Sequence, residues 1–330
     1  MEYKPQPDRY TNGMFYRRCG DSGIQLPVIS LGFWHNFGNT DCYATGLELV
    51  EYAFDHGVCH FDLANNYGPP AGSAEENFGR MMKQSFAAHR DEMFITSKAG
   101  HEMWPGPYGG CSSRKNLMAS IDQSLKRMNL DYVDLFYSHR YDGITPINET
   151  MQALVDIVRQ GKALYIGLSK YPVDKLLYAL NYLHDAGVPC LAYQDRYNMF
   201  DRHIEKDHLQ ICMEKGIGVV AFSPLAQGIL SSKYLNGIPA DSRAARPEGY
   251  LKQSDVTPDK IAKVAHLRPI AEQRGQSISQ LAIAWILRRK EIGSVIIGAR
   301  NLDQLKDSLH AVDNLSLSPS EIELIENILK

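Results

Sequence analysis

The chain has 330 residues, of which 44% are hydrophobic and 22% charged, and its formal net charge is -3. These values are ordinary for a soluble globular protein, and the absence of a basic block argues against nucleic acid as the main partner. No apolar run approaches the ~20 residues that a membrane helix needs, and the polar start at 1–5 is unlike a signal peptide. Six scattered cysteines without a C-x-x-C pair favour free thiols. We therefore expect a cytoplasmic protein without a metal site.

A β-hairpin is expected ahead of the main body, because strand-like runs at 14–18 and 24–28 flank the turn sequence Gly20-Asp21-Ser22-Gly23. Beyond it, short apolar strands alternate with helical patterns. The predicted strands lie at 29–31, 60–62, 93–98, 133–137, 163–168, 191–194, 218–222 and 294–297. The predicted helices lie at 43–56, 74–83, 113–128, 147–160, 173–185, 204–214, 261–274, 279–288, 302–311 and 320–329.

This alternation favours an α/β fold, a (β/α)8 TIM barrel that spans residues 1–330 as a single domain, with an N-terminal β-hairpin and a C-terminal helix. A doubly wound open sheet would give the same spacing. Two observations favour the barrel. The first strand is not followed by the G-x-G-x-x-G loop of dinucleotide-binding sheets, and polar residues recur at the carboxyl ends of many strands, where barrels build active sites. The polar segment 243–255 is interpreted as a mobile surface loop.

The stretch His60–Gly68 has the pattern of a strand that runs into a loop. Asp62 lies at the strand end between apolar neighbours, and Tyr67 follows on the loop. A carboxylate and a phenol placed in this way suit proton transfer. An aspartate at a strand end also caps loops, however, and a tyrosine before Gly-Pro also packs against its turn.

Two further strand ends supply partners for this pair. The third predicted strand ends in Lys98, and the fourth leads into His139. Held by Asp62, Lys98 stays cationic, and we expect its charge to lower the Tyr67 pKa from its usual ~10 toward working pH. His139 would donate a hydrogen bond to a carbonyl oxygen, and Tyr67 would give its proton as that oxygen gains charge. The four residues predict a site for hydride addition to a carbonyl carbon.

Asp62, Tyr67, Lys98 and His139 resemble, in order and context, the catalytic tetrad of the aldo-keto reductases. The resemblance is strongest to the branch of that family that holds bacterial L-glyceraldehyde 3-phosphate reductases and the potassium-channel β subunits. It rests on the amino-acid sequences of the segments 34–38, 61–70, 73–79, 103–109 and 224–228. The resemblance implies the barrel, NADPH as the hydride donor, no metal, and small aldehyde substrates such as L-glyceraldehyde 3-phosphate and methylglyoxal.

The same resemblance implies the cofactor contacts. They are Trp34, Asp62, Ser169, Gln194, Phe222, Ser223, Pro224, Leu225, Gln227, Lys233, Arg243, Gly298, Arg300, Gln304 and Ser308. Ser169 and Gln194 match positions that hold the nicotinamide carboxamide, and Phe222 matches the residue that stacks on the ring. The segment 223–227 matches the pyrophosphate loop, with Lys233 and Arg243 as basic partners. Arg300 and Gln304 would bind the adenosine 2′-phosphate and favour NADPH over NADH.

The chain departs from its relatives near the adenine. Arg300 stands where they have serine, and Asp307 and Ser308 stand where they have Glu and Asn. The sequence also stops soon after the helix at 320–329, without the long segment that covers the pocket in many monomeric reductases. Pocket walls are therefore expected from barrel loops, with Trp34, Trp104 and Tyr141 as candidates, or from a neighbouring subunit. The sequence does not give the oligomeric state, but the resemblance implies a homo-oligomer, because relatives form tetramers or octamers.

Two other functions stay open from the sequence. A regulatory module like the channel β subunits would bind nicotinamide and turn over slowly, and His139 argues against it because channel subunits depart from His there. A hydrolase would pair Asp62 with Glu75 or Glu76, but it would leave Lys98 unused, and both glutamates fit the acidic first turn of a helix.

A substrate phosphate would need cationic donors. Arg140, Lys170 and Arg196 lie just past strand ends, where they would face such a group. Each of them also fits an ordinary solvated position at the rim of the barrel.

Overall fold

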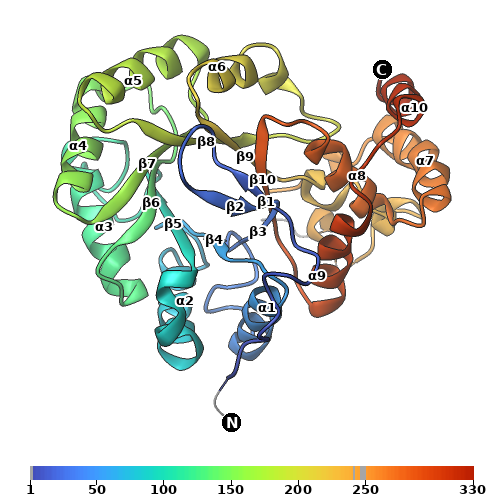
Figure 1. Cartoon of the computed structure of the whole chain (residues 1–330), viewed down its shortest axis with the longest axis horizontal. Coiled ribbons are helices and arrows are strands. Elements are labelled where there is room, and N and C mark those ends of the chain that lie inside the picture. The colour runs from blue at the N-terminus through green and yellow to red at the C-terminus, as the bar shows by residue number, and fades with distance from the viewer. Residues whose placement is uncertain (1–2, 241, 246–249) are drawn as a thin grey trace.

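In a computed structural model that describes residues 3–240, 242–245 and 250–330, eight parallel strands close into a barrel in the order β10-β3-β4-β5-β6-β7-β8-β9 (Figure 1). The strands are β3 (Ile29–Gly32), β4 (His60–Asp62), β5 (Phe94–Ala99), β6 (Val133–Ser138), β7 (Ala163–Ser169), β8 (Cys190–Arg196), β9 (Gly218–Phe222) and β10 (Ile292–Ile297). The predicted barrel is confirmed, and the open doubly wound sheet is wrong. The alternation of one strand with one helix is what brings successive strands side by side in parallel.

Helices surround the barrel on its outer face (Figure 1). They are α1 (Tyr43–Asp55), α2 (Ser73–Met81), α3 (Arg114–Met128), α4 (Ile147–Arg159), α5 (Val173–Asp185), α6 (His208–Glu214), α8 (Ile278–Leu287) and α9 (Leu302–Leu309). Two more, α7 (Pro258–Gln273) and α10 (Pro319–Leu329), lie together beyond α8, near the C-terminus. The predicted helix at 74–83 continues past α2 as a π-helical turn, Met82–Phe86, and the one at 204–214 divides into a 3-10 turn, His203–Glu205, and α6.

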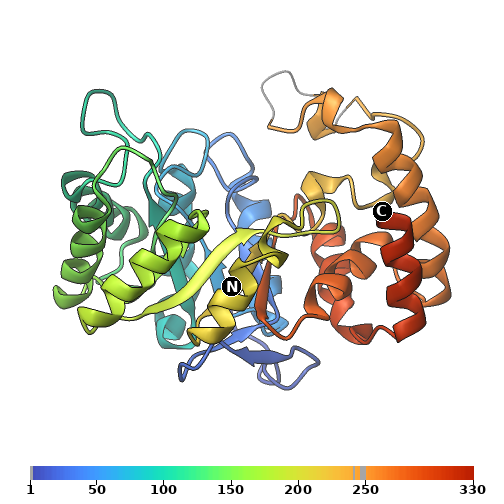
Figure 2. The same ribbon diagram turned by 90° about the horizontal axis from the view of Figure 1, so that it is seen from above.

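The antiparallel hairpin of β1 (Tyr16–Arg18) and β2 (Gln25–Pro27) closes one end of the barrel, while the loops that follow the strands lie at the other end (Figure 2). Cys19 in the hairpin turn is buried and packs into the barrel interior. Its sulfur would lie only 2.2 Å from a Cβ on Gly218, so glycine is required there for the hairpin to seat. The closed end leaves the opposite rim as the place for a site.

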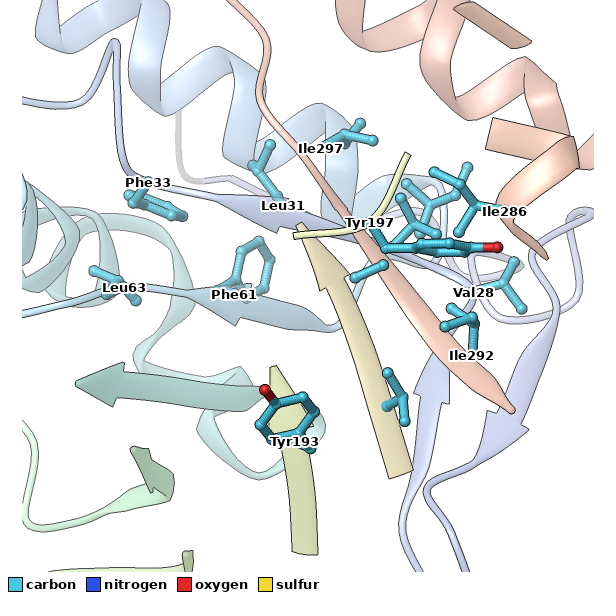
Figure 3. Packing of buried hydrophobic residues seen from close by; sticks show 14 of the residues in the cluster. Val28, Leu31, Phe33, Phe61, Leu63, Tyr193, Tyr197, Ile286, Ile292 and Ile297 are labelled. Carbon is cyan, nitrogen blue, oxygen red and sulfur yellow. The ribbon is translucent and has the colours of Figure 1, made fainter. Parts of the chain in front are cut away.

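Alternate side chains of β6 enter two separate hydrophobic clusters. On β6, Leu135 and Tyr137 fill the barrel interior, whereas Phe136 between them packs outward under the helices. Figure 3 shows part of the outer cluster, including Phe61 and Leu31 on neighbouring strands. This two-residue alternation is the ordinary consequence of strand geometry. It also decides which polar residues near the strand ends face the barrel axis.

The segment predicted as a mobile surface loop is only partly described. Residues 246–249 lie outside the described residues. The flanking parts form short 3-10 turns at Arg243–Ala245 and Gln253–Asp255, and Ala244 and Leu251 are buried. The segment is therefore anchored to the body of the protein on both sides.

None of the helices in the described residues has the length and apolar character that crossing a membrane requires. Across the described ranges, His, Cys, Asp and Glu side chains form no group of three or more that could hold a metal ion. All six cysteines are free thiols.

Candidate active site

The polar residues predicted from the strand ends converge on one rim of the barrel. Asp62 is the last residue of β4, Lys98 lies near the end of β5, and His139 directly follows β6. These three strands pair in sequence order with parallel registers, so their carboxyl ends are neighbours. Strand pairing, rather than proximity in sequence, brings the tetrad together.

Three of the four tetrad residues are in direct contact. The Lys98 ammonium donates hydrogen bonds to Asp62 Oδ2 at 2.6 Å, to the Leu63 carbonyl at 2.7 Å and to the Tyr67 hydroxyl at 3.3 Å. Lys98 is fully buried and Asp62 is 2% exposed. All three donor positions of the ammonium are used, which fixes its location beside the phenol.

The Asp62 carboxylate is held on its second oxygen as well. Thr96 Oγ1 and Gln194 Nε2 each donate to Asp62 Oδ1 at 2.9 Å. Sequence reasoning gave Gln194 a different partner, the nicotinamide amide, and did not single out Thr96. The strand pairing of Asp62 with Thr96 is the signal that points to this contact, because it places the two side chains on the same face of adjacent strands.

Burial dominates the titration of Tyr67. Burial first, and the charge of Asp62 second, raise the pKa of Tyr67 well above its ordinary value. The prediction that Lys98 lowers this pKa is wrong for the protein alone. Burial penalises the charged form of Lys98 too and lowers its pKa, an effect that Asp62 opposes. Tyr67 is consequently a neutral phenol that carries its proton, which is the form that a proton donor needs.

His139 lies beside Tyr67, with 5.9 Å between the ring centroids, and is 6% exposed. Burial, followed by the charge of Lys98, lowers the pKa of His139 well below its ordinary value, so the imidazole is neutral. Its Nδ1 has no hydrogen-bond partner among the described residues. A neutral, buried histidine with an unpaired nitrogen is equipped to exchange hydrogen bonds with a bound molecule.

His101 is a neighbour that sequence reasoning missed. Its ring stands perpendicular to that of His139, with 4.5 Å between the centroids. Burial lowers the pKa of His101 to about 4, and the charge of Lys170 adds to the effect. Nothing in the sequence points to this contact, because His101 begins an irregular loop that follows β5.

The loop that carries Tyr67 is tied down from several sides. The Asn65 amide N–H donates to the Lys98 carbonyl at 2.9 Å, and the Asn65 side chain donates to Ser120 on α3 at 3.2 Å. A Cβ on Gly38 would lie 2.5 Å from the Pro69 carbonyl oxygen, so glycine permits the close approach of the two loops. Asn65, which has no evident role in the sequence, therefore positions the tyrosine loop.

Glu75 is more than the acidic first turn of a helix. It does lie in the first turn of α2, as expected, but it is also fully buried. One oxygen accepts a hydrogen bond from Ser97 Oγ at 2.5 Å and the other from Arg127 Nε at 2.8 Å. Because both oxygens are engaged on the outer face of β5, Glu75 does not pair with Asp62 as a hydrolase would require.

The rim beside the tetrad has the features that a nicotinamide amide needs. Ser169 is the last residue of β7 and pairs in register with Gln194 on β8. Its hydroxyl is buried without a hydrogen-bond partner among the described residues, which is costly unless a ligand satisfies it. Phe222 ends β9 and is partly exposed, so its ring is accessible at the same rim.

The segment after β9 adopts the tight backbone expected of a loop that approaches a ligand closely. Ser223 and Gln227 have positive φ angles of 56° and 60°, and the Asn198 side chain holds the Ser223 carbonyl at 3.0 Å. Pro224 is buried, and Leu225 is partly exposed. Such backbone turns cost energy and occur often at ligand sites.

The two basic residues predicted to accompany this loop lie in the short turns that follow it. Lys233 is in the 3-10 turn Ser232–Tyr234, and Arg243 begins the next one, Arg243–Ala245. Both side chains are partly exposed. Neither is part of the tetrad cluster.

The turn between β10 and α9 is open to a ligand. Gly298 and Arg300 are exposed, and a Cβ on Gly298 would meet nothing within 4 Å. The Asn301 side chain caps α9 by accepting from the Gln304 N–H at 3.0 Å, and the Gln304 side chain accepts from the Arg300 N–H at 3.0 Å. Ser308, one helical turn further on, is buried.

Trp34 follows β3 and makes a ring contact with a distant part of the chain. Its ring lies 5.0 Å from that of Tyr250, which belongs to the long segment after β9. The loop after β3 and this segment therefore meet at Trp34.

Comparisons with known proteins agree with this geometry. The model of the aldo/keto reductase family matches residues 28–330. The L-glyceraldehyde 3-phosphate reductases of Escherichia coli O157:H7 and of Escherichia coli K12 are each 48% identical over 99% of this chain and 95% of their own length. A probable voltage-gated potassium channel subunit beta of Arabidopsis thaliana is 36% identical over 96% of this chain and 97% of its own length.

Proposed function

Since the chain belongs to the aldo/keto reductase family, and is therefore an oxidoreductase, we propose that it reduces small aldehydes and ketones to alcohols with NADPH as the hydride donor and Tyr67 as the general acid. The observation that carries the proposal is the contact of the buried Lys98 with both Asp62 and the Tyr67 hydroxyl.

Each of the four tetrad residues has its own role in the proposed reduction. The neutral Tyr67 phenol transfers its proton to the substrate's carbonyl oxygen, and an N–H of neutral His139 donates a hydrogen bond to that oxygen. Lys98 stabilises the phenolate that remains on Tyr67, while Asp62 keeps the ammonium charged and in place. A bound nicotinamide would supply the hydride that adds to the carbonyl carbon, which balances the proton that goes to the oxygen.

The cofactor would lie along the rim from Ser169 to α9. Its amide would bind Ser169 and Gln194, with Phe222 against the ring, and its pyrophosphate would follow 223–227 with Lys233 and Arg243 as cationic partners. Trp34 would cover it, and Gly298 and Ser308 would border the adenosine. The open turn before α9 suits an anion, because N–H groups at a helix start attract negative charge.

Preference for NADPH is proposed from Arg300 and Gln304, which would hold the 2′-phosphate. Arg300→Ala should raise the KM for NADPH about 10-fold or more and leave the KM for NADH within about 2-fold, since only NADPH carries that phosphate. Equal changes for the two cofactors would refute this role of Arg300.

The named relatives support a proposal for the substrate class. Because the E. coli reductases are named for L-glyceraldehyde 3-phosphate, we propose this aldehyde, together with methylglyoxal-like compounds, as substrates. The channel subunits support a second candidate, a nicotinamide-binding regulatory module with slow turnover. His139 favours the enzyme, since a regulatory module has no need of a second hydrogen-bond donor beside Tyr67.

A panel assay separates these functions. The purified chain would be mixed with NADPH and matched aldehydes, with and without phosphate, and cofactor oxidation followed by absorbance. We expect steady turnover of about 1 s⁻¹ or faster. A single slow turnover per chain, with cofactor retained, would favour the regulatory module, and absence of reduction with every aldehyde would refute the reductase. We also propose that the chain forms a homo-oligomer, a tetramer or an octamer, which light scattering would test. We propose that it is located in the cytoplasm, which cell fractionation would test.

A further inference from the structure

Two cationic side chains stand directly beside the tetrad, each one residue beyond a site residue. Arg140 follows His139 after β6, and Lys170 follows Ser169 after β7. Because β6 and β7 are paired neighbours whose register runs to Ser138 opposite Leu168, both basic residues follow the same end of adjacent strands. They are close enough for the charge of Arg140 to act on Lys170.

The backbone at Lys170 is held in an uncommon conformation. Its φ is 54°, in the left-handed region that non-glycine residues seldom adopt, and its N–H bonds to the Gln194 carbonyl at 3.3 Å. Residues kept in this region cost energy and cluster at ligand sites. The direction of the chain after β7 is therefore set at Lys170 itself.

Neither cation forms an ion pair with an acid among the described residues. Lys170 is partly buried, and the charge of Asp195 offsets its positive charge only in part. Arg140 uses only Nε, which donates to the Gly100 carbonyl at 3.1 Å and leaves the two terminal nitrogens of the guanidinium without a protein partner. Long basic side chains with free heads are ordinary in water, but here they adjoin a buried reaction site.

The carboxylates nearest to this pair are engaged elsewhere. Asp142 accepts hydrogen bonds from the N–H groups of Ser112, Ile144 and Thr145 and from the Thr145 hydroxyl. Asp195 accepts from the Tyr193 hydroxyl at 2.5 Å and from the Arg196 N–H at 2.7 Å.

The positive charge of Lys170 and Arg140 shifts the pKa values of neighbouring groups. Burial, and then the charge of Lys98, lower the pKa of Lys170 to about 8; Asp195 opposes this shift, and Arg140 adds to it. Lys170 and Arg140 also lower the pKa of His101 and of His139. The surroundings of His101 and His139 are therefore a region of positive potential.

We infer that Lys170 and Arg140 form an anion site that binds the phosphate of the aldehyde substrate, and so make the enzyme selective for phosphorylated aldehydes. The inference rests on the proposed reductase function and adds the residues that would set its specificity. The two free N–H groups of the Arg140 fork match two phosphate oxygens, and the Lys170 ammonium matches the third. A short carbon chain would then reach from this anchor to the carbonyl between Tyr67 and His139.

Arg196 lies at the edge of this region and is not part of the site. Its side chain is 54% exposed and pairs with Asp201 at 3.7 Å. It therefore contributes long-range attraction, which salt screens, instead of a direct bond.

The test compares one aldehyde with and without its phosphate. For glyceraldehyde 3-phosphate and glyceraldehyde, kcat/KM would be measured in the original chain, in Lys170→Ala and in Arg140→Ala. We expect the ratio of the two values to fall about 10- to 100-fold in each variant, because charged hydrogen bonds to phosphate are lost. Lys170→Arg should recover most of the ratio. Inorganic phosphate should inhibit the original chain competitively and inhibit both alanine variants more weakly.

Lys175→Ala is the matched control, because Lys175 is a partly exposed lysine of the following helix, α5, paired with Asp174. It removes the same charge and should leave the ratio unchanged. If Lys170→Ala and Arg140→Ala lower kcat/KM equally for both aldehydes, or weaken NADPH binding without changing the ratio, the anion site is refuted while the reductase stands. If the original chain reduces neither aldehyde, it is the proposed function that fails.

Discussion

Two buried carboxylates lie on opposite sides of the same strand, β5, and only one belongs to the candidate site. Lys98 points into the barrel and binds Asp62 at 2.6 Å, whereas the preceding residue, Ser97, points outward and binds Glu75, which also holds Arg127 at 2.8 Å. Adjacent strand residues face opposite sides of the wall. A single step along the chain thus separates two charged clusters with different surroundings.

The clusters differ in what they leave unsatisfied. The outer one is closed, because each Glu75 oxygen has its own donor and Arg127 reaches partly into solvent. The inner one adjoins unpaired groups, the Ser169 hydroxyl and His139 Nδ1, at the rim where a ligand would enter. A buried ion pair by itself is weak evidence for function. The unpaired polar atoms around it are what distinguish a site from a structural pair.

Lys98→Met should show the largest effect, because it removes the cation and leaves Asp62 charged and buried. We expect a loss of about 3–5 kcal/mol in the free energy of unfolding and a fall in kcat of about 100-fold or more. Denaturant unfolding and cofactor oxidation would measure the two. The double variant Asp62→Asn with Lys98→Met should regain much of the stability but none of the activity. A double variant no more stable than the single one would contradict the buried-pair argument.

Glu75→Gln should separate the outer cluster from the inner one. The amide keeps the shape and one acceptor but removes the charge that Arg127 pairs with, so we expect about 1–3 kcal/mol of destabilisation. Activity should stay within about 5-fold, because Glu75 touches neither Tyr67 nor His139. A fall in kcat comparable to that of Lys98→Met, at a temperature where the variant is folded, would show that the outer cluster acts in the reaction.

Acid should weaken the fold through its buried histidines, and this is the smallest of the expected effects. Burial lowers the pKa of fully buried His60 to about 4. Between pH 6.5 and 5 the unfolded chain gains a proton there that the folded chain does not, so stability falls as pH falls, by up to about 1.4 kcal/mol per pH unit. His60→Asn should reduce this slope in urea unfolding experiments.

His203 provides the control for that slope. Hydrogen bonds to Asp195 and Asp201 raise the pKa of His203 to about 10. The contribution of His203 to the free energy of unfolding is therefore complete below pH 6.5 and is lost as pH rises toward 10. His203→Gln should therefore leave the slope between pH 6.5 and 5 unchanged. An unchanged slope in His60→Asn, or a changed one in His203→Gln, would contradict the assignment.

The sequence was informative where geometry follows from strand order. Asp62, Lys98 and His139 lie at or just past the ends of strands adjacent in the chain, and a closed barrel places such ends next to one another. Element boundaries shifted by a residue or two because helix ends continue as 3-10 or π turns, as at 82–86. The topology and the tetrad contacts were therefore within reach of the sequence.

What the sequence could not supply depends on burial and on contacts between loops. Glu75 satisfies the pattern of an acidic helix start whether it faces solvent or the barrel wall, so its burial was invisible. The effect on Tyr67 was misjudged because a pairwise argument weighs the charge of Lys98 but not the loss of water around the phenol. His101 contacts His139 through an irregular loop that no periodicity describes.

The central claim is that Tyr67 gives the proton at a site organised by Asp62 and Lys98, and Tyr67→Phe tests it most directly. The measurement is kcat for NADPH-dependent aldehyde reduction, with NADPH affinity determined separately by fluorescence titration. Removing one hydroxyl group should lower kcat about 100- to 10,000-fold and leave the dissociation constant of NADPH within about 3-fold. Reduction by the Tyr67→Phe variant at near the original rate would contradict the account.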